Sequence, residues 1–183
     1  MNRPLDTVIK NVRVVRPGRV SVDLLDVGVK EGKFARLAPD IRVEEANEVI
    51  DGGNLLAFPG CVDAHMHVGV YQPLAQDAVT ESKAAAIGGV TSSLNYTHGI
   101  PRDASDCRTK ATSPSASMPT SRWWTRTNRS SCAPRSPQQG YTPFEGQELT
   151  GRVKSTLLRG RLVDHDGNIV GPARGQYLRR PAR

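Results

Sequence analysis

Hydrophobic and polar positions in the first fifty residues alternate in short runs that end at turn-forming residues. Turns at Pro17-Gly18, Glu31-Gly32 and Gly52-Gly53 separate these runs. The pattern predicts short strands of the kind found in a β-sandwich, over residues 7–15, 20–30, 33–37 and 48–50. Three basic residues in and just after the first strand are predicted to lie on a solvated face: Lys10, Arg13 and Arg16.

After residue 60 the pattern changes to strand, helix and strand. A strand over residues 61–67 follows the turn Pro59-Gly60. A helix is predicted from about Thr80, its N-cap, to Ile87, where Gly88-Gly89 ends it. The next strand covers residues 90–96. This order predicts a parallel pair of strands with a right-handed helical crossover, a βαβ unit.

The first strand of this unit carries polar side chains at alternate positions, namely Asp63, His65 and His67. Side chains at i, i+2 and i+4 of a strand share one face, and the imidazoles are then about 7 Å apart along the backbone. Two such imidazoles suit a zinc-type ion, and an aspartate beside them can orient a ligand or reach the metal's water. We therefore predict His65 and His67 as metal ligands and Asp63 as a catalytic residue. The alternatives are two ordinary histidines and an aspartate that bonds to strand-end backbone.

These residues belong to longer runs that resemble a known family. Residues 59–67 and 81–92 are similar to the start of the metal-dependent amidohydrolase superfamily, in particular the cyclic amidohydrolases such as hydantoinases, dihydropyrimidinases, allantoinases and dihydroorotases. Residues 141–146, 149–153 and 159–163 resemble the closing segment of hydantoinase-like enzymes. The resemblance covers roughly residues 5–100 and 140–182.

The resemblance implies a (β/α)8 TIM barrel, an α/β fold, with a small β-sandwich built from both chain ends. It implies hydrolysis of a C–N bond in a small cyclic amide or ureide, with two divalent metal ions, zinc by expectation, and with His65 and His67 as the first ligand pair. The family's later ligands are a carboxylated lysine, two more histidines and an aspartate. No matching strands carry them here: Lys83 is on the wrong element, Lys110 and His98 lie beyond the second strand, and His165 is in a far hairpin.

The length of 183 residues is short for a TIM barrel, which typically needs about 250. We therefore expect a barrel fragment, the first βαβ unit, beside parts of the sandwich, and a chain that is inactive by itself. The alternative function is a non-catalytic β-sandwich module for interaction or homo-oligomerisation. The expected parts are residues 1–58 and 140–183 for the sandwich, 59–100 for the βαβ unit and 101–139 for an aberrant, disordered linker.

The predicted linker holds seven basic and two acidic residues, so +5 of the chain's +7 lies there. It contains no Val, Ile, Leu, Phe or Tyr, and we expect neither helix nor strand in it. It reads as a shifted reading frame or deletion junction, as a natural linker, or as a basic arm for single-stranded nucleic acid, the last being the least favoured. Nucleic acid is therefore not an expected partner.

The residues after 140 again predict strands, between 149 and 163, and a hairpin turn over Asp164-His165-Asp166-Gly167-Asn168. The three cysteines have neither metal-ligand nor disulfide spacing, which indicates a reducing, cytoplasmic setting. No signal-like or membrane-spanning apolar run is present, so a membrane is not an expected partner either.

Overall fold

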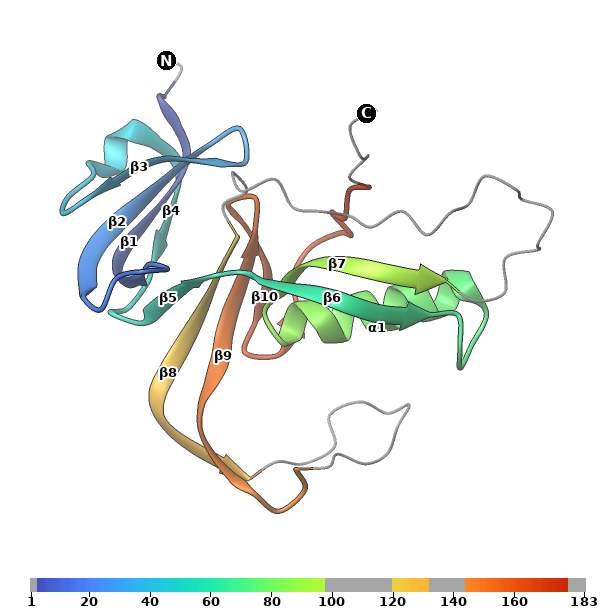
Figure 1. Cartoon of the computed structure of the whole chain (residues 1–183). Coiled ribbons are helices and arrows are strands. Elements are labelled where there is room, and N and C mark those ends of the chain that lie inside the picture. Colours follow the sequence, from blue (N-terminus) through green and yellow to red (C-terminus); the bar gives the residue numbers. More distant parts are fainter. Residues whose placement is uncertain (1–2, 98–119, 132–143, 178–183) are drawn as a thin grey trace.

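The computed structural model describes residues 3–97, the backbone of 120–131, and residues 144–177. The described residues form mostly strands, with one α-helix among them (Figure 1). The elements are β1 (Leu5–Val15), β2 (Val22–Lys30), β3 (Lys33–Ala38), the 3-10 turn η1 (Val43–Glu45), β4 (Ala46–Asp51), β5 (Leu56–Pro59), β6 (Cys61–Val68), α1 (Leu74–Ile87), β7 (Val90–Thr97), β8 (Thr120–Ser131), β9 (Glu148–Leu158), β10 (Arg161–His165) and β11 (Asn168–Ile169).

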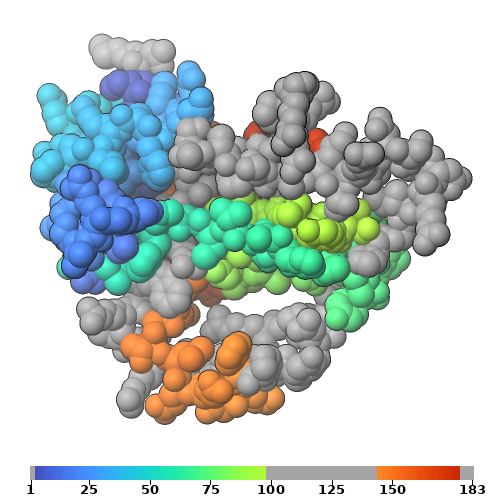
Figure 2. Space-filling model, in the orientation of Figure 1, coloured from blue at the N-terminus to red at the C-terminus, as the bar shows by residue number. Residues whose placement is uncertain are grey.

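The described strands form two sheets, of which the larger is mixed and the smaller is parallel. The larger sheet runs β11-β10-β9-β8-β5-β1-β2-β3, with β4 added parallel to β1. The smaller sheet is the parallel pair β6 and β7. The predicted N-terminal strands are confirmed, each within two residues at either end. In the space-filling view these strands (blue) form a lobe at one end of the βαβ unit (green) (Figure 2).

Both ends of the chain contribute to one hydrophobic core. Leu157 of β9 is fully buried and belongs to the same cluster as Ile9 and Val12 of β1 and Val29 of β2. The turn after β9 also approaches β2 closely, since a Cβ on Gly160 would lie 2.6 Å from a methyl carbon of Val29. Burying a side chain such as Leu157 stabilises the fold by about 1.5–3 kcal/mol. The N-terminal and C-terminal strands therefore depend on each other.

The expectation of no strand in residues 101–139 is wrong for β8, Thr120–Ser131. This strand pairs antiparallel with β5 on one side and with β9 on the other. Its sequence contains three threonines and two tryptophans, residue types enriched in strands, and strand pairing uses main-chain hydrogen bonds that any residue except proline supplies. The expectation rested on the absence of Val, Ile, Leu, Phe and Tyr and gave the threonines and the tryptophan pair no weight. The remainder of the predicted linker lies outside the described residues.

The predicted parallel strand-helix-strand unit is confirmed, with β6 and β7 side by side and α1 against them (Figure 1). The helix begins at Leu74, six residues before the predicted start, and it ends at Ile87 as predicted. Pro73 stands at the N-cap, and Thr80 lies inside the helix, where its hydroxyl donates to the carbonyls of Gln76 and Asp77. A threonine hydroxyl that bonds back to the preceding turn suits the helix interior as well as its start.

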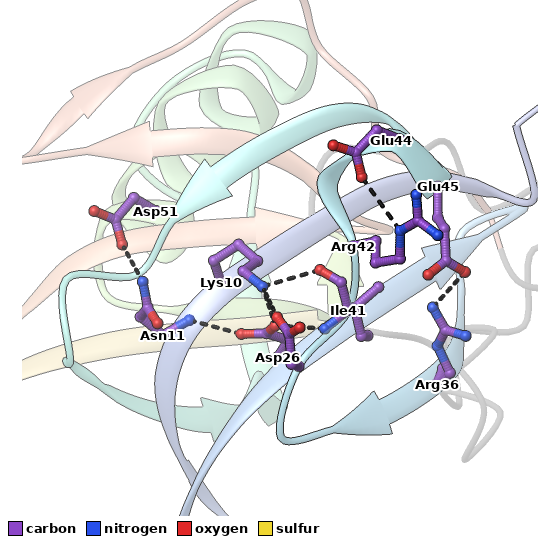
Figure 3. Close-up of polar contacts among 10 residues, drawn as sticks. Lys10, Asn11, Asp26, Arg36, Ile41, Arg42, Glu44, Glu45 and Asp51 are labelled. Atoms are coloured by element: carbon purple, nitrogen blue, oxygen red, sulfur yellow. Dashed lines mark hydrogen bonds and ion pairs between the residues drawn. The ribbon is translucent and has the colours of Figure 1, made fainter.

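The prediction of a solvated face is wrong for Lys10. Its ammonium group contacts Asp26 at 2.5 Å, and Asp26 is 2% exposed (Figure 3). The backbone N–H groups of Asn11 and Ile41 also donate to this carboxylate. Burial raises the pKa of Asp26, but these three hydrogen bonds outweigh it and hold the pKa below its usual value. Lys10 therefore stabilises the interior of the sheet.

The predicted C-terminal hairpin is confirmed. Strands β10 and β11 pair antiparallel around Asp166 and Gly167, whose φ angles of 53° and 82° are those of a tight two-residue turn. Within the described residues, no helix has the length and apolar character needed to cross a membrane.

Candidate metal centre

His65 and His67 of β6 lie together beside Tyr96 of β7. The parallel register places His67 opposite Tyr96. The Tyr96 ring stacks on His65 with 4.3 Å between ring centroids and on His67 with 5.7 Å. Sequence reasoning missed Tyr96, although a parallel register drawn from the βαβ pattern would have put it near the histidines. The tyrosine restricts the rotation of both imidazoles.

The two imidazoles meet through their Nε2 atoms, which are 2.8 Å apart. Both side chains are exposed. Two ring nitrogens this close share one proton, one donating and the other accepting. A tetrahedral zinc ion with bonds of about 2.0–2.1 Å separates two ligand nitrogens by about 3.3 Å. The pair thus fits two donors of one ion after a small opening of the rings and loss of the shared proton.

Asp63 is held differently. Its Oδ1 accepts a hydrogen bond from the backbone N–H of His65 at 3.0 Å. The pairing of β6 with β7 is irregular between Asp63 and Met66, so strict alternation of side chains is interrupted within this stretch, which includes His65. The carboxylate thus bonds to main chain, and a role for Asp63 toward a metal remains a prediction.

Other candidate ligands do not complete this centre. Within residues 3–97 and 144–177, no group of three or more His, Cys, Asp or Glu side chains could hold a metal ion. Lys83 lies exposed on α1, and the Nδ1 of His165 contacts the hydroxyl of Ser155 at 2.8 Å in the C-terminal strands. His98 and Lys110 lie outside the described residues. A catalytic zinc normally has three protein ligands and a water molecule.

Asp77, which sequence reasoning also missed, fixes the loop that follows the two histidines. It lies in the first turn of α1 and is 1% exposed. Its Oδ2 accepts hydrogen bonds from the backbone N–H groups of Gly69 at 2.6 Å and Val70 at 3.2 Å. One turn later, burial raises the pKa of Glu81, and the negative charge of Asp77 raises it further. An acidic residue in the first turn of the helix was the available signal.

No family model matches this chain. Three curated proteins illustrate the relatives that do match: a dihydroorotase from Geobacter metallireducens is 32% identical over 89 residues, an L-hydantoinase from Paenarthrobacter aurescens is 33% identical over 93, and an allantoinase from Escherichia coli strain SMS-3-5 is 37% identical over 90. About half of this chain is homologous to cyclic amidohydrolases.

These matches cover 47–49% of this chain and 19–21% of each relative, so the chain spans about a fifth of the length of the amidohydrolases it matches. Among solved structures, the L-hydantoinase from Arthrobacter aurescens aligns with a TM-score of 0.42 at 29% identity, covering 50% of this chain and 21% of that one. A D-hydantoinase aligns with a TM-score of 0.42 at 30% identity, covering 50% and 20%.

Proposed function

We propose that this chain carries the first metal-binding strand of a cyclic amidohydrolase, with His65 and His67 as two ligands of a divalent ion, zinc by preference. The observation that supports this most is the 2.8 Å approach of the two Nε2 atoms on β6 in a chain with cyclic amidohydrolase homologues. The unit β6-α1-β7 then corresponds to the opening βαβ of a TIM barrel. The strands at both chain ends then correspond to parts of the accompanying sandwich.

In the proposed reaction class, water is added across a C–N bond of a small cyclic amide or ureide. A zinc-type ion held by this pair would lower the pKa of its bound water toward about 7 and would polarise the substrate carbonyl. The residues of this chain would hold the ion and orient its ligands. His65 and His67 would donate their ring nitrogens to the ion, Tyr96 limits the rotation of both rings, and Asp77 fixes the loop after them. Asp63, two residues before His65 on the same strand, is proposed as the catalytic acidic residue beside the pair.

We further propose that this chain binds metal weakly and has no hydrolytic activity of its own. Two imidazoles provide fewer donors than a catalytic zinc site requires. The experiment is zinc titration of the 183-residue chain by calorimetry, alongside His65→Ala, His67→Ala and, as the matched control, His165→Ala. We expect the parent chain to bind zinc with a micromolar or weaker dissociation constant. His65→Ala and His67→Ala should each abolish this binding, and His165→Ala should leave it unchanged. Equal binding by all four proteins would contradict the assignment of the pair.

Activity is measured separately on hydantoin, dihydrouracil, dihydroorotate and allantoin with zinc in excess. We expect no ring opening above that of zinc in buffer. Turnover that disappears in His67→Ala would show that this chain builds a complete centre and would overturn the proposal of inactivity while leaving the metal assignment in place.

A second candidate function is a non-catalytic interaction module. It is supported by the core that Leu157 shares with β1 and β2, because such a core holds both chain ends together without a barrel. Limited proteolysis distinguishes the two candidates. A protected product in which residues 3–59 and 144–170 stay associated supports the module, and digestion of all segments at one rate contradicts it.

A further inference from the structure

A cavity of about 540 Å³ lies between the βαβ unit and the C-terminal hairpin. Its walls are mostly apolar and come from Met66 and Val68 of β6, from Ala86 on α1 and from Ile169 and Val170 after β10. His65 and His67 do not line it. Cavities of about 300–1,000 Å³ with apolar walls and a few polar groups are typical of small-molecule sites. This cavity is therefore separate from the candidate metal centre.

Two arginines of the C-terminal part line this cavity, Arg159 and Arg174. The Arg159 guanidinium donates to the backbone carbonyl of Arg174, which brings the two residues together. Among the described residues, neither guanidinium forms an ion pair with an acidic side chain. Burial lowers the pKa of Arg159, and the neighbouring charge of Arg174 lowers it further. Asp6, Glu31 and Glu48 line a neighbouring cavity together with these two arginines, but no ion pair joins them to either guanidinium among the described residues. Both guanidiniums therefore keep hydrogen-bond donors for an added anion.

The backbone position of Arg159 strengthens this argument. Arg159 and Gly160 form the tight turn between β9 and β10, and both have positive φ angles, 51° and 76°. Asparagine, aspartate or glycine is favoured at the first of these positions, and a long side chain is unusual there. The stem of Arg159 also packs on Gly32, where a Cβ would lie 3.1 Å from the Cβ of Arg159. The turn therefore holds a charged side chain in place at the edge of the cavity.

We propose that this cavity binds an amphipathic organic anion of medium length. The anionic head, a carboxylate or a sulfonate, lies against the guanidiniums of Arg159 and Arg174, and the apolar tail lies along Met66, Val68 and Ala86. Planar guanidinium groups bind carboxylates through paired charge-assisted hydrogen bonds. Burial of the apolar tail against the apolar walls contributes favourably to the free energy of binding. Binding requires no metal ion and does not depend on the proposed hydrolase function.

The test is calorimetric titration of the full chain with decanoate in the presence of EDTA, and with decyltrimethylammonium, which has the same tail and the opposite charge. We expect saturable binding of one decanoate per chain and no saturable binding of the cation. Substitution of Arg159→Gln should weaken decanoate binding by at least about tenfold, as expected for loss of a charge-assisted hydrogen bond. Arg174→Gln, in an exposed segment after the last strand, should weaken it in the same direction.

Two matched controls separate the site from general adsorption. Arg36→Gln removes the same charge from a side chain of β3 that pairs with Glu45 and does not line the cavity. Ala86→Phe fills the cavity, whereas Ala84→Phe adds the same ring to an exposed position of α1 that does not line it. We expect Ala86→Phe to abolish binding and both controls to stay within twofold of the parent chain.

The proposal is overturned if decanoate does not saturate, if the cationic amphiphile binds equally well, or if Arg36→Gln weakens binding as much as Arg159→Gln. Equal effects of Ala84→Phe and Ala86→Phe would also overturn it. Circular dichroism establishes that each variant is folded, and the comparison of the two amphiphiles on the parent chain holds even if Arg159→Gln does not fold.

Discussion

The N-terminal sheet and the βαβ unit differ sharply in how well they are packed. In the sheet, β1 and β2 bury a continuous set of aliphatic side chains together with Leu157. In the βαβ unit, Asp77 is the only buried residue of α1, and Val68 is the only buried apolar side chain of β6. A rigid shell around a metal site is what fixes its ligands. The difference indicates that most of the apolar core lies in the sheet, whereas the histidine pair is held by Tyr96 and by the loop that Asp77 fixes, with little apolar packing around them.

The largest expected effect comes from the shared core. Leu157→Ala removes a fully buried side chain between the two chain ends and should lower the free energy of unfolding by about 2–5 kcal/mol. Leu149→Ala, in the exposed part of the same strand, is the matched control and should cost far less. Chemical denaturation followed by circular dichroism measures both. Equal losses would mean that the chain ends do not share a core.

The next effect concerns the buried ion pair of the sheet. Asp26→Asn should lower the free energy of unfolding by about 3 kcal/mol, because it removes the buried carboxylate that pairs with Lys10 and accepts from the backbone N–H groups of Asn11 and Ile41. Asp40→Asn, whose side chain is 78% exposed beside the same lysine, should cost less than about 1 kcal/mol.

The same pair gives a pH dependence with a defined sign. The folded-state pKa of Asp26 is lowered, so its stabilising contribution is present above the ordinary value of about 4 and is lost as the pH falls through the lower folded-state value. Chemical denaturation at a series of pH values measures the free energy of unfolding. The difference in this free energy between the parent chain and Asp26→Asn should shrink as the pH falls from neutral to acidic values. A difference that stays constant down to the lowest pH would contradict the ion pair.

A smaller effect is expected in the βαβ unit at Asp77. Asp77→Asn weakens the two hydrogen bonds to the loop after β6 and should cost about 1–2 kcal/mol locally. Hydrogen exchange at the amides of Gly69 and Val70 reports this directly, and zinc affinity should fall with it. Glu81→Gln, one turn along the same helix, is the control. Unchanged exchange at both amides would show that Asp77 does not hold the loop.

The smallest effect is expected at Tyr96. Tyr96→Leu removes the ring that stacks on both imidazoles and should reduce stability by less than about 1 kcal/mol. Zinc binding should weaken by a few-fold, because the histidines gain rotational freedom. Tyr71→Leu, an exposed tyrosine in the loop before α1, should change neither property.

The sequence predicted those parts of the molecule that local patterns control. Alternating strands, glycine turns such as Asp166-Gly167 and the parallel crossover of the βαβ unit all depend on short-range chemistry. Other features depend on contacts between residues far apart in the sequence. The sequence places Lys10 on a strand with polar neighbours, and only the fold shows that its ammonium group pairs with the buried Asp26 of β2. Strand β8 was missed because it lacks the apolar residues on which the expectation rested, and its place between β5 and β9 appears only in the sheet.

The candidate site divides in the same way. The spacing of His65 and His67 was enough to bring them together, since two residues on one strand need no other element. The placement of Asp63 was less predictable, because the irregular pairing between β6 and β7 depends on the partner strand. Tyr96 and Asp77 come from neighbouring elements, so their contribution appears only once the register of β7 and the start of α1 are known.

X-ray absorption spectroscopy at the zinc edge most directly tests whether the chain holds half of a metal centre. The spectrum of the zinc-loaded 183-residue chain reports how many imidazole nitrogens surround the ion. We expect two, with water or buffer oxygens in the remaining positions, and loss of the imidazole signal in the double substitution His65→Ala and His67→Ala. Three or more imidazole ligands, or an unchanged spectrum in the double variant, would contradict this account.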